Sequence, residues 1–242
     1  MIRKKQKKVP QYFEGARTEV ATFLPASCQR VLEIGCGAGG FRDNIRTPCE
    51  YWGIEPATVP AARAVQRMDR VLEGTFDAVR AQLPKNYFDL VICNDVIEHL
   101  PDHDAFLQQI KTYMAPDGCL VGSVPNVRCY QHLYELLFER DWHYRAEGIL
   151  DRTHLRFFTQ KSLKRTFTEN GYHIEAFAGI NNLAPARFTS PKKIRRWLTV
   201  TLLALFTLGL CNDIRYLQFG FRVRSKAALP DFSASAKDTR PD

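Results

Sequence analysis

Four glycines and one acid stand together in the stretch VLEIGCGAGGF, residues 31–41. Gly35, Gly37 and Gly40 give the spacing G-x-G-x-x-G, which lets a backbone come close to a nucleotide cofactor. Glu33 precedes the first glycine, and its carboxylate would repel a pyrophosphate but attract an ammonium group. The loop therefore favours an adenosine that carries positive charge over a dinucleotide.

A second acid, Glu55, lies twenty residues after Gly35 at the end of a predicted strand. A carboxylate in this position can accept hydrogen bonds from both ribose hydroxyls of an adenosine. His99 follows the predicted strand at 88–94, and His154 lies in a charged stretch further along. Because histidine is the side chain poised for proton transfer near neutral pH, both are candidate general bases.

Apolar, β-branched segments alternate with helical ones along the chain. The predicted strands are 30–35, 51–55, 70–74, 88–94, 119–125 and 215–224, the last at or near an edge of the sheet. The predicted helices are 104–115, capped by Asp102 or Asp104, and 160–170, capped by Thr159. This order predicts an α/β fold: a doubly wound, mostly parallel, seven-stranded sheet with helices on both faces, in a Rossmann-like arrangement.

These motifs occur in the order and at the spacing of the class I S-adenosylmethionine-dependent methyltransferases. The chain resembles that family over roughly residues 10–180, through VLEIGCGAGGF, YWGIEP, FDLVICNDVIEHLPDHDAF and GSVPN. The resemblance implies that S-adenosyl-L-methionine is the cofactor. It also implies the residues that hold the cofactor: Glu33, Gly35 and Gly37 for the methionine part, Gly39 in the same loop, and Glu55 for the ribose.

By the same resemblance, Asn94 and Asp95 form the floor near the sulfonium, and Asp95 joins the two histidines as a candidate catalytic residue. Many members carry an Asp near the position of Thr75 to bind the adenine amino group, and this chain does not. Thr75 and Phe76 are therefore the candidates on the adenine side. Phe76 either covers the adenine ring or packs in the core.

The segments SVPNVR (123–128) and DWHYRAEGILDRTHLRFFT (141–159) resemble a branch associated with sugar and cell-envelope glycan modification. The expected reaction is O-methylation of a sugar or glycan hydroxyl, with His99 or His154 as the base. A nucleic-acid methyltransferase is disfavoured because N/D-P-P-Y is missing after the fourth strand. A non-catalytic cofactor-binding module is disfavoured by the intact glycine loop and Glu55.

Asp95, Glu98 and His99 form the pattern D-x-x-E-H, which resembles the E-x-x-E-H of ubiquinone-biosynthesis O-methyltransferases. In those enzymes a divalent cation can assist deprotonation of a catechol-like hydroxyl. Here Asp replaces the first Glu, which shortens its reach. We predict no metal ligand, and Mg²⁺-assisted methylation of a quinone-like hydroxyl is the alternative.

With 242 residues, of which 45% are hydrophobic and 25% charged, the chain is predicted to form one enzyme-sized domain. We expect a basic arm at 1–9, a methyltransferase domain at 10–225 and a disordered tail at 226–242. The seven cysteines show no CxxC pairing, which is typical of reduced thiols in the cytoplasm. No apolar run follows the basic start, so we expect no signal peptide.

Positive charge concentrates at 2–8 and 192–196, and the net charge is +8. The uncharged stretch 197–211, within an apolar helical segment at 193–212, would span about 22 Å as a helix, less than the ~30 Å core of a bilayer. It is interpreted either as a buried helix or homodimer contact, or as part of a peripheral contact through 192–211 with the inner face of the membrane. At that surface a lipid-linked acceptor would meet the enzyme.

Overall fold

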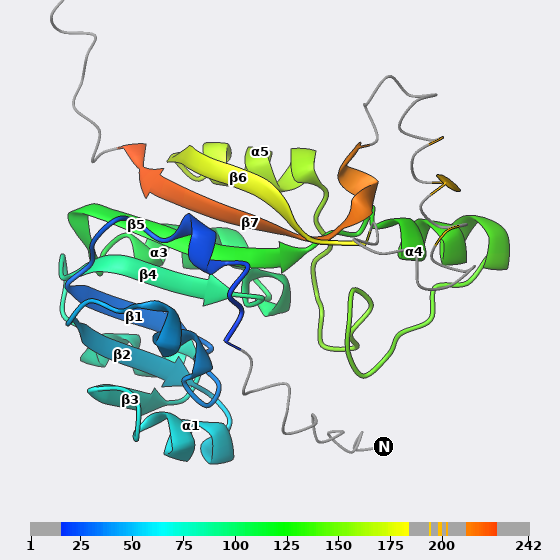
Figure 1. Cartoon of the computed structure of the whole chain (residues 1–242). Coiled ribbons are helices and arrows are strands. Elements are labelled where there is room, and N and C mark those ends of the chain that lie inside the picture. Colours follow the sequence, from blue (N-terminus) through cyan, green and yellow to red (C-terminus); the bar gives the residue numbers. More distant parts are fainter. Residues whose placement is uncertain (1–15, 184–193, 195–197, 200–201, 203–211, 227–242) are drawn as a thin grey trace, which may run out of the picture.

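The apolar run from Leu90 to Cys93 has no exposed surface, because it forms the central strand of a seven-stranded sheet. A computed structural model describes residues 16–183, 194, 198–199, 202 and 212–226. The strands stand in the order β3-β2-β1-β4-β5-β7-β6 (Figure 1). Their bounds are β1 Arg30–Ile34, β2 Glu50–Glu55, β3 Arg70–Glu73, β4 Phe88–Asn94, β5 Met114–Pro125, β6 Tyr172–Asn182 and β7 Tyr216–Ser225.

The first five strands in the sequence are parallel, and β7 pairs antiparallel with both β5 and β6. Alternate side chains of β4 enter two apolar clusters, one on each face of the sheet. Val91 and Cys93 belong to the cluster that includes Phe106, whereas Leu90 and Ile92 belong to the other. The predicted doubly wound sheet is therefore confirmed.

The helices and helical turns are short, and none of those described exceeds ten residues. The α-helices are α1 Thr58–Ala64, α2 Phe76–Val79, α3 His103–Ile110, α4 Tyr130–Tyr134 and α5 Gln160–Glu169. The remaining turns are η2 Ala21–Phe23, η3 Gly40–Asn44, η4 Arg80–Gln82, η5 Ile97–His99, η6 Glu135–Glu139 and η7 Asn212–Arg215. The glycine loop thus leads into a short 3₁₀ helix, η3.

Both predicted helix starts are confirmed by side-chain caps. The Asp102 carboxylate accepts a hydrogen bond from the Ala105 backbone N–H at 2.8 Å, and Thr159 forms a capping box with Ser162. The predicted end of the first helix is wrong, because α3 stops at Ile110 and the chain from Met114 already belongs to β5. An irregularity in the pairing of β5 with β4 accommodates this early start.

Strand β6 was not predicted, and its presence leaves β7 one position in from the edge of the sheet. Most of β6 is partly exposed, so its sequence lacks the continuous apolar run of the inner strands. In the part of the chain that the structure describes, six cysteines are free and no helix is long and apolar enough to cross a membrane. The basic arm at 1–9, nearly all of 192–211 and the tail beyond Lys226 lie outside the described residues.

Candidate functional site

Three glycines shape the loop between β1 and η3. Gly35, Gly37 and Gly39 have φ values of +71°, +55° and +81°, a region that side chains with a Cβ rarely adopt. A side chain at position 35 would also be crowded, because its Cβ would lie 3.0 Å from Cγ2 of Val96. The Gly35 N–H donates to the Ile54 carbonyl at 2.8 Å, which fixes the loop against the end of β2. Of these three glycines, Gly35 is exposed at the carboxyl end of β1, and Gly37 and Gly39 are buried.

Glu55 ends β2 and is 4% exposed. Its Oε2 accepts a hydrogen bond from the Gly37 N–H at 2.9 Å, and its Oε1 accepts one from the Ala57 N–H at 2.8 Å. These two donors hold the carboxylate in one orientation beside the glycine loop. Each oxygen has a second lone pair, so the carboxylate can also accept the two hydroxyls of a ribose.

Glu33, in β1, is 3% exposed and accepts a hydrogen bond from the Tyr51 hydroxyl at 2.8 Å. Burial raises the pKa of Glu33 to about 8, while the Tyr51 hydrogen bond and the Arg17 charge act in the opposite direction. A cation placed beside this carboxyl would favour its ionised form. The contact of Glu33 with the ammonium group of a cofactor stays a prediction.

Asn94 ends β4 and is 8% exposed. Neither its Nδ2 nor its Oδ1 hydrogen-bonds to any group in the part of the chain that the structure describes. A buried carboxamide without partners is costly, so a ligand that supplies hydrogen bonds here would offset that cost, and the contact of Asn94 with the cofactor stays a prediction. Together with the glycine loop and two buried acids, it offers polar groups that suit those of S-adenosylmethionine.

Asp95 lies next to Asn94 but makes different contacts. Its backbone has a φ of +51°, and its carboxylate accepts hydrogen bonds from Arg17 at 2.5 Å, Ser123 at 2.7 Å and Gln218 at 2.6 Å. Three donors on one carboxylate give Asp95 the role of joining the N-terminal segment to β5 and β7. Its expected place at the floor near the sulfonium stays a prediction.

Glu98, His99 and His154 form a cluster in which one ligand atom from each lies within 4.8 Å of the others. The His99 and His154 rings meet edge to face with centroids 4.7 Å apart. Nε2 of His154 lies 3.9 Å from Oε1 of Glu98, and that carboxylate is only 1% exposed. The structure thus brings together the two histidines that the sequence proposed separately and adds a buried acid beside them.

The segment that carries His154 is held on η5 by backbone hydrogen bonds. The N–H groups of Leu155 and Arg156 donate to the Glu98 carbonyl at 2.8 and 3.0 Å. Nδ1 of His154 lies 2.8 Å from the Ile149 carbonyl, and Nδ1 of His99 lies 3.1 Å from the Thr153 carbonyl. A carbonyl oxygen requires a proton on the nitrogen that faces it, so Nε2 is the basic nitrogen of each neutral ring.

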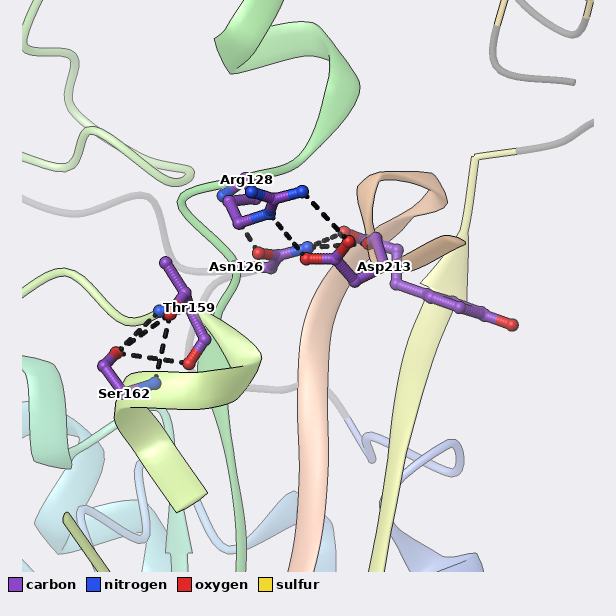
Figure 2. A network of polar contacts seen from close by, with 6 residues as sticks. Asn126, Arg128, Thr159, Ser162 and Asp213 are labelled. Atoms are coloured by element: carbon purple, nitrogen blue, oxygen red, sulfur yellow. Dashed lines mark hydrogen bonds and ion pairs between the residues drawn. The ribbon is translucent and has the colours of Figure 1, made fainter. Parts of the chain in front are cut away.

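The long connection between β5 and α5 projects beyond the ends of the strands (Figure 1). Asn126, fully buried, fixes its start, because its Nδ2 donates to the carbonyls of Asp213 and Tyr216 at 2.9 and 3.0 Å. Figure 2 shows Arg128 reaching the Asp213 carboxylate from the same segment, with Nε 2.8 Å from Oδ2. No motif in the sequence indicates this anchor, because its partners lie about 85 residues further along the chain.

The two residues expected near the adenine lie at the start of α2. Thr75 is exposed and stands at the N-cap position. The Phe76 ring packs edge to face against Phe106 and Tyr113, with centroid distances of 5.1 and 5.9 Å. These contacts place Phe76 in the core, and its contact with an adenine stays a prediction.

Comparison with known proteins gives a family for the chain. The model of a methyltransferase-domain family matches residues 6–176. The chain is similar to the mitochondrial ubiquinone biosynthesis O-methyltransferase of Bos taurus, with 24% identity over 188 residues, 72% of this chain and 50% of that protein. It is also similar to the (S)-tetrahydroprotoberberine N-methyltransferase of Eschscholzia californica, with 26% identity over 122 residues, 48% of this chain and 35% of that protein. The matches therefore span half or less of the length of these curated relatives.

Solved structures share the fold. A SAM-dependent methyltransferase from Archaeoglobus fulgidus superposes with a TM-score of 0.59 at 19% identity, covering 89% of this chain and 94% of that chain. An S-adenosylmethionine-dependent methyltransferase from Mesorhizobium loti gives a TM-score of 0.57 at 17% identity, covering 87% and 98%. At these identities the likeness establishes the architecture.

Replacing Glu55 tests the ribose contact. Glu55→Ala should weaken S-adenosylmethionine binding about 10–150-fold, because the ribose hydroxyls and the Gly37 N–H lose their acceptor. Isothermal titration calorimetry measures this affinity. Glu50→Ala, at the opposite end of β2, is the matched control and should bind normally. A folded Glu55→Ala protein with wild-type affinity would remove the ribose assignment.

Because the pKa of Glu33 is raised, we predict that cofactor binding releases a proton from this carboxyl group. With its pKa at about 8, Glu33 is mostly protonated at pH 7, and the cofactor ammonium should ionise it. Affinity should therefore rise as the pH approaches 8 from below, at most about tenfold per pH unit. Titration at pH 7 in phosphate and in Tris should give different heats, and Glu33→Gln should abolish that difference. Glu73→Gln, at the end of β3, is the control. Equal heats for the wild type would refute the assignment.

Proposed function

Because this chain belongs to the class I S-adenosylmethionine-dependent methyltransferases, we propose that it transfers a methyl group to a hydroxyl of a sugar or glycan. The observation that carries this proposal is the cluster of Glu98, His99 and His154 at the carboxyl end of β4. A hydroxyl acceptor must lose a proton as it is methylated, and the cluster offers two imidazoles beside a buried carboxylate to take it. When bound, S-adenosylmethionine supplies an electrophilic methyl group on its sulfonium.

His154 is the favoured base. The Ile149 carbonyl 2.8 Å from its Nδ1 fixes the ring so that Nε2 takes the proton, and Glu98 lies 3.9 Å from Nε2 to stabilise the imidazolium that forms. His99 packs against His154 and is less buried, so it is the competing base. Alignment of the acceptor contributes the larger part of catalysis in models of such reactions, about 7–11 kcal/mol.

A ring-shaped acceptor is supported by the aromatic side chains that continue outward from His154. Phe157 follows at a centroid distance of 6.5 Å, and Trp142 meets Phe157 at 5.3 Å. Trp142 is 38% exposed, so part of its indole is open to a ligand. Aromatic rings present a broad apolar face with polar edges, which suits the apolar face of a sugar ring. The sugar branch suggested by residues 141–159 is consistent with such a surface.

Metal-assisted methylation of a quinone-like hydroxyl is the second candidate. The ubiquinone-biosynthesis relatives support it, as does the proximity of Glu98, His99 and His154. The ligand set differs from the one that the sequence suggested, because His154 takes the place of Asp95. Two imidazoles and one carboxylate suit Mn²⁺, Fe²⁺ or Zn²⁺ better than Mg²⁺. Such an ion would lower the pKa of the acceptor hydroxyl.

Substitution of the two histidines tests the base. We expect S-adenosylhomocysteine to form with a sugar or oligosaccharide from an acceptor panel that also includes catechols and quinols. On that acceptor, His154→Ala should lower turnover about 10²–10⁴-fold and leave cofactor affinity nearly unchanged. His99→Ala is the competing variant. His143→Ala, exposed in the same connection, is the control and should keep full turnover.

The panel and the variants separate the alternatives. A His154→Ala enzyme at full rate with an inactive His99→Ala enzyme would move the base to His99. Activity confined to catechols, lost with EDTA and restored by Mn²⁺ or Zn²⁺, would establish the metal-assisted candidate. Cofactor binding without turnover on either class of acceptor would point to a binding module.

Peripheral membrane contact through 192–211 is the proposed route to a lipid-linked acceptor. The described residues of this segment include Ile194, Leu198 and Leu202, each of which is helical and exposed. Their spacing of four residues in the sequence is the spacing of one helix face. Binding to anionic phosphatidylglycerol vesicles should fall as salt rises but persist through the apolar contact. Leu198→Glu with Leu202→Glu should remove the salt-resistant part in co-sedimentation. If the wild-type protein stays in the supernatant at low salt, the membrane proposal is wrong. The remaining interpretations of 197–211 are then a buried helix or a dimer contact.

A further inference from the structure

Arg156 lies where the segment that carries His154 docks on η5. Its backbone N–H donates to the Glu98 carbonyl at 3.0 Å. Its side chain reaches the same part of the chain, because Nη2 donates to the Pro101 carbonyl at 2.6 Å, while Nη1 donates to the Leu155 carbonyl at 2.9 Å. These hydrogen bonds hold an exposed guanidinium next to η5, the turn that carries Glu98.

The positive charge of Arg156 has no acid beside it. In the part of the chain that the structure describes, this guanidinium forms no ion pair, and its hydrogen bonds go to carbonyl oxygens. Arg152, two residues before His154, is also exposed, and its Nε lies 3.4 Å from the Tyr144 carbonyl. Among the described residues it has no ion pair either. Two uncompensated cations therefore flank His154 in the sequence, one on each side.

Two other arginines of the connection between β5 and α5 behave differently. Nε of Arg128 lies 2.8 Å from the Asp213 carboxylate, and Nη2 of Arg145 lies 2.7 Å from Oε1 of Glu135. Each of these two arginines has its own carboxylate, which already balances its charge. The arginines beside His154 are thus distinguished by a charge that a ligand can still neutralise.

A guanidinium suits an anion with two oxygens, such as a carboxylate or a phosphate. Its five N–H donors lie in a planar fork, and two parallel hydrogen bonds to such an anion are both strong and directional. Carbonyl oxygens occupy two donors of Arg156, so three remain for a ligand. An anion near this cluster also requires a cation, because the buried Glu98 carboxylate would repel it.

We propose that the methyl acceptor is an anionic sugar, whose carboxylate or phosphate Arg156 binds while Arg152 adds positive charge. This inference rests on the proposed function for the sugar. Two residues of chain separate the Cα atoms of Arg156 and His154 by at most about 7 Å, which is comparable with the width of a substituted sugar ring. An oxyanion held by Arg156 would therefore leave a hydroxyl of the same ring close to the histidines.

Sugars that differ only in charge test the proposal. Methyl glucoside and methyl galactoside are each supplied as the neutral sugar, the 6-carboxylate and the 6-phosphate, and S-adenosylhomocysteine formation gives kcat/KM. We expect the wild-type enzyme to prefer a charged form over its neutral counterpart about 10–100-fold. The KM of that form should rise with salt. Preference for the 6-carboxylate identifies a uronic acid as the acceptor, and preference for the 6-phosphate identifies a phosphorylated sugar.

Arg156→Gln keeps a hydrogen-bond donor for the Pro101 carbonyl but removes the charge. It should abolish the preference for the charged sugar, mainly by raising KM, whereas Arg156→Lys should recover part of it. Arg152→Gln should reduce the preference by a smaller factor. Arg145→Gln is the matched control, since its charge is already paired with Glu135, and it should retain the full preference. Thermal unfolding confirms that each variant is folded.

Two results would overturn the inference alone. One is a wild-type enzyme that methylates the neutral sugars as well as the charged ones or better. The other is an Arg156→Gln enzyme that keeps the preference, or that loses activity equally on charged and neutral sugars, because Arg156 would then only hold η5 in place. Turnover on none of the six sugars would overturn the proposed sugar acceptor as well, so the two failures are distinguishable.

Discussion

Three carboxylates, Glu33, Glu55 and Glu98, are buried at the carboxyl ends of adjacent strands, with exposures of 3%, 4% and 1%. An ionised carboxylate taken out of water costs several kcal/mol unless charges or hydrogen bonds offset the loss. The structure meets this cost differently at each position. Backbone N–H groups hold Glu55, a hydroxyl and a raised pKa accommodate Glu33, and an imidazole lies beside Glu98. These contacts tie the glycine loop, β2 and the segment around His154 to the three carboxylates.

The glycine loop illustrates the dependence. Its positive φ values turn the Gly37 N–H toward Glu55, and the same turn leaves the backbone open to a ligand. Tyr51 extends from β2 to reach Glu33, and burial raises the pKa of this tyrosine as well. Both carboxyl groups are thus held in place before any ligand enters. Preorganised polar groups do not have to be reorganised during reaction, which is the usual source of electrostatic catalysis.

The connection between β5 and α5, which we propose binds the methyl acceptor, is built differently from the glycine loop. The connection between β5 and α5 carries most of the exposed aromatic side chains, among them Phe138, Trp142 and Tyr144. Asn126 and Arg128 fix its start (Figure 2). The Glu98 carbonyl fixes it again just after His154. Between these anchors few side chains are buried. If this connection binds the methyl acceptor, as we propose, its sequence can change with the substrate without disturbing the sheet.

The sequence by itself determined the sheet, the glycine loop and the family. Strands buried on both faces must be almost wholly apolar, and tight turns must use glycine, so both features are local and can be recognised without the structure. The same holds for the capped start of α5 at Thr159. Edge strand β6 escaped prediction because a partly exposed strand has no such signature.

Tertiary structure decided which side chains meet. His99 and His154 are 55 residues apart, and only the docking of one segment on the Glu98 carbonyl makes them neighbours. Asp95 is three residues from Glu98 in the sequence, yet its carboxylate accepts hydrogen bonds from Arg17, Ser123 and Gln218. It does not join the cluster that Glu98 forms with His99 and His154. Such contacts depend on how segments far apart in the sequence pack against each other. That packing exists only in the folded chain, so the sequence does not reveal it.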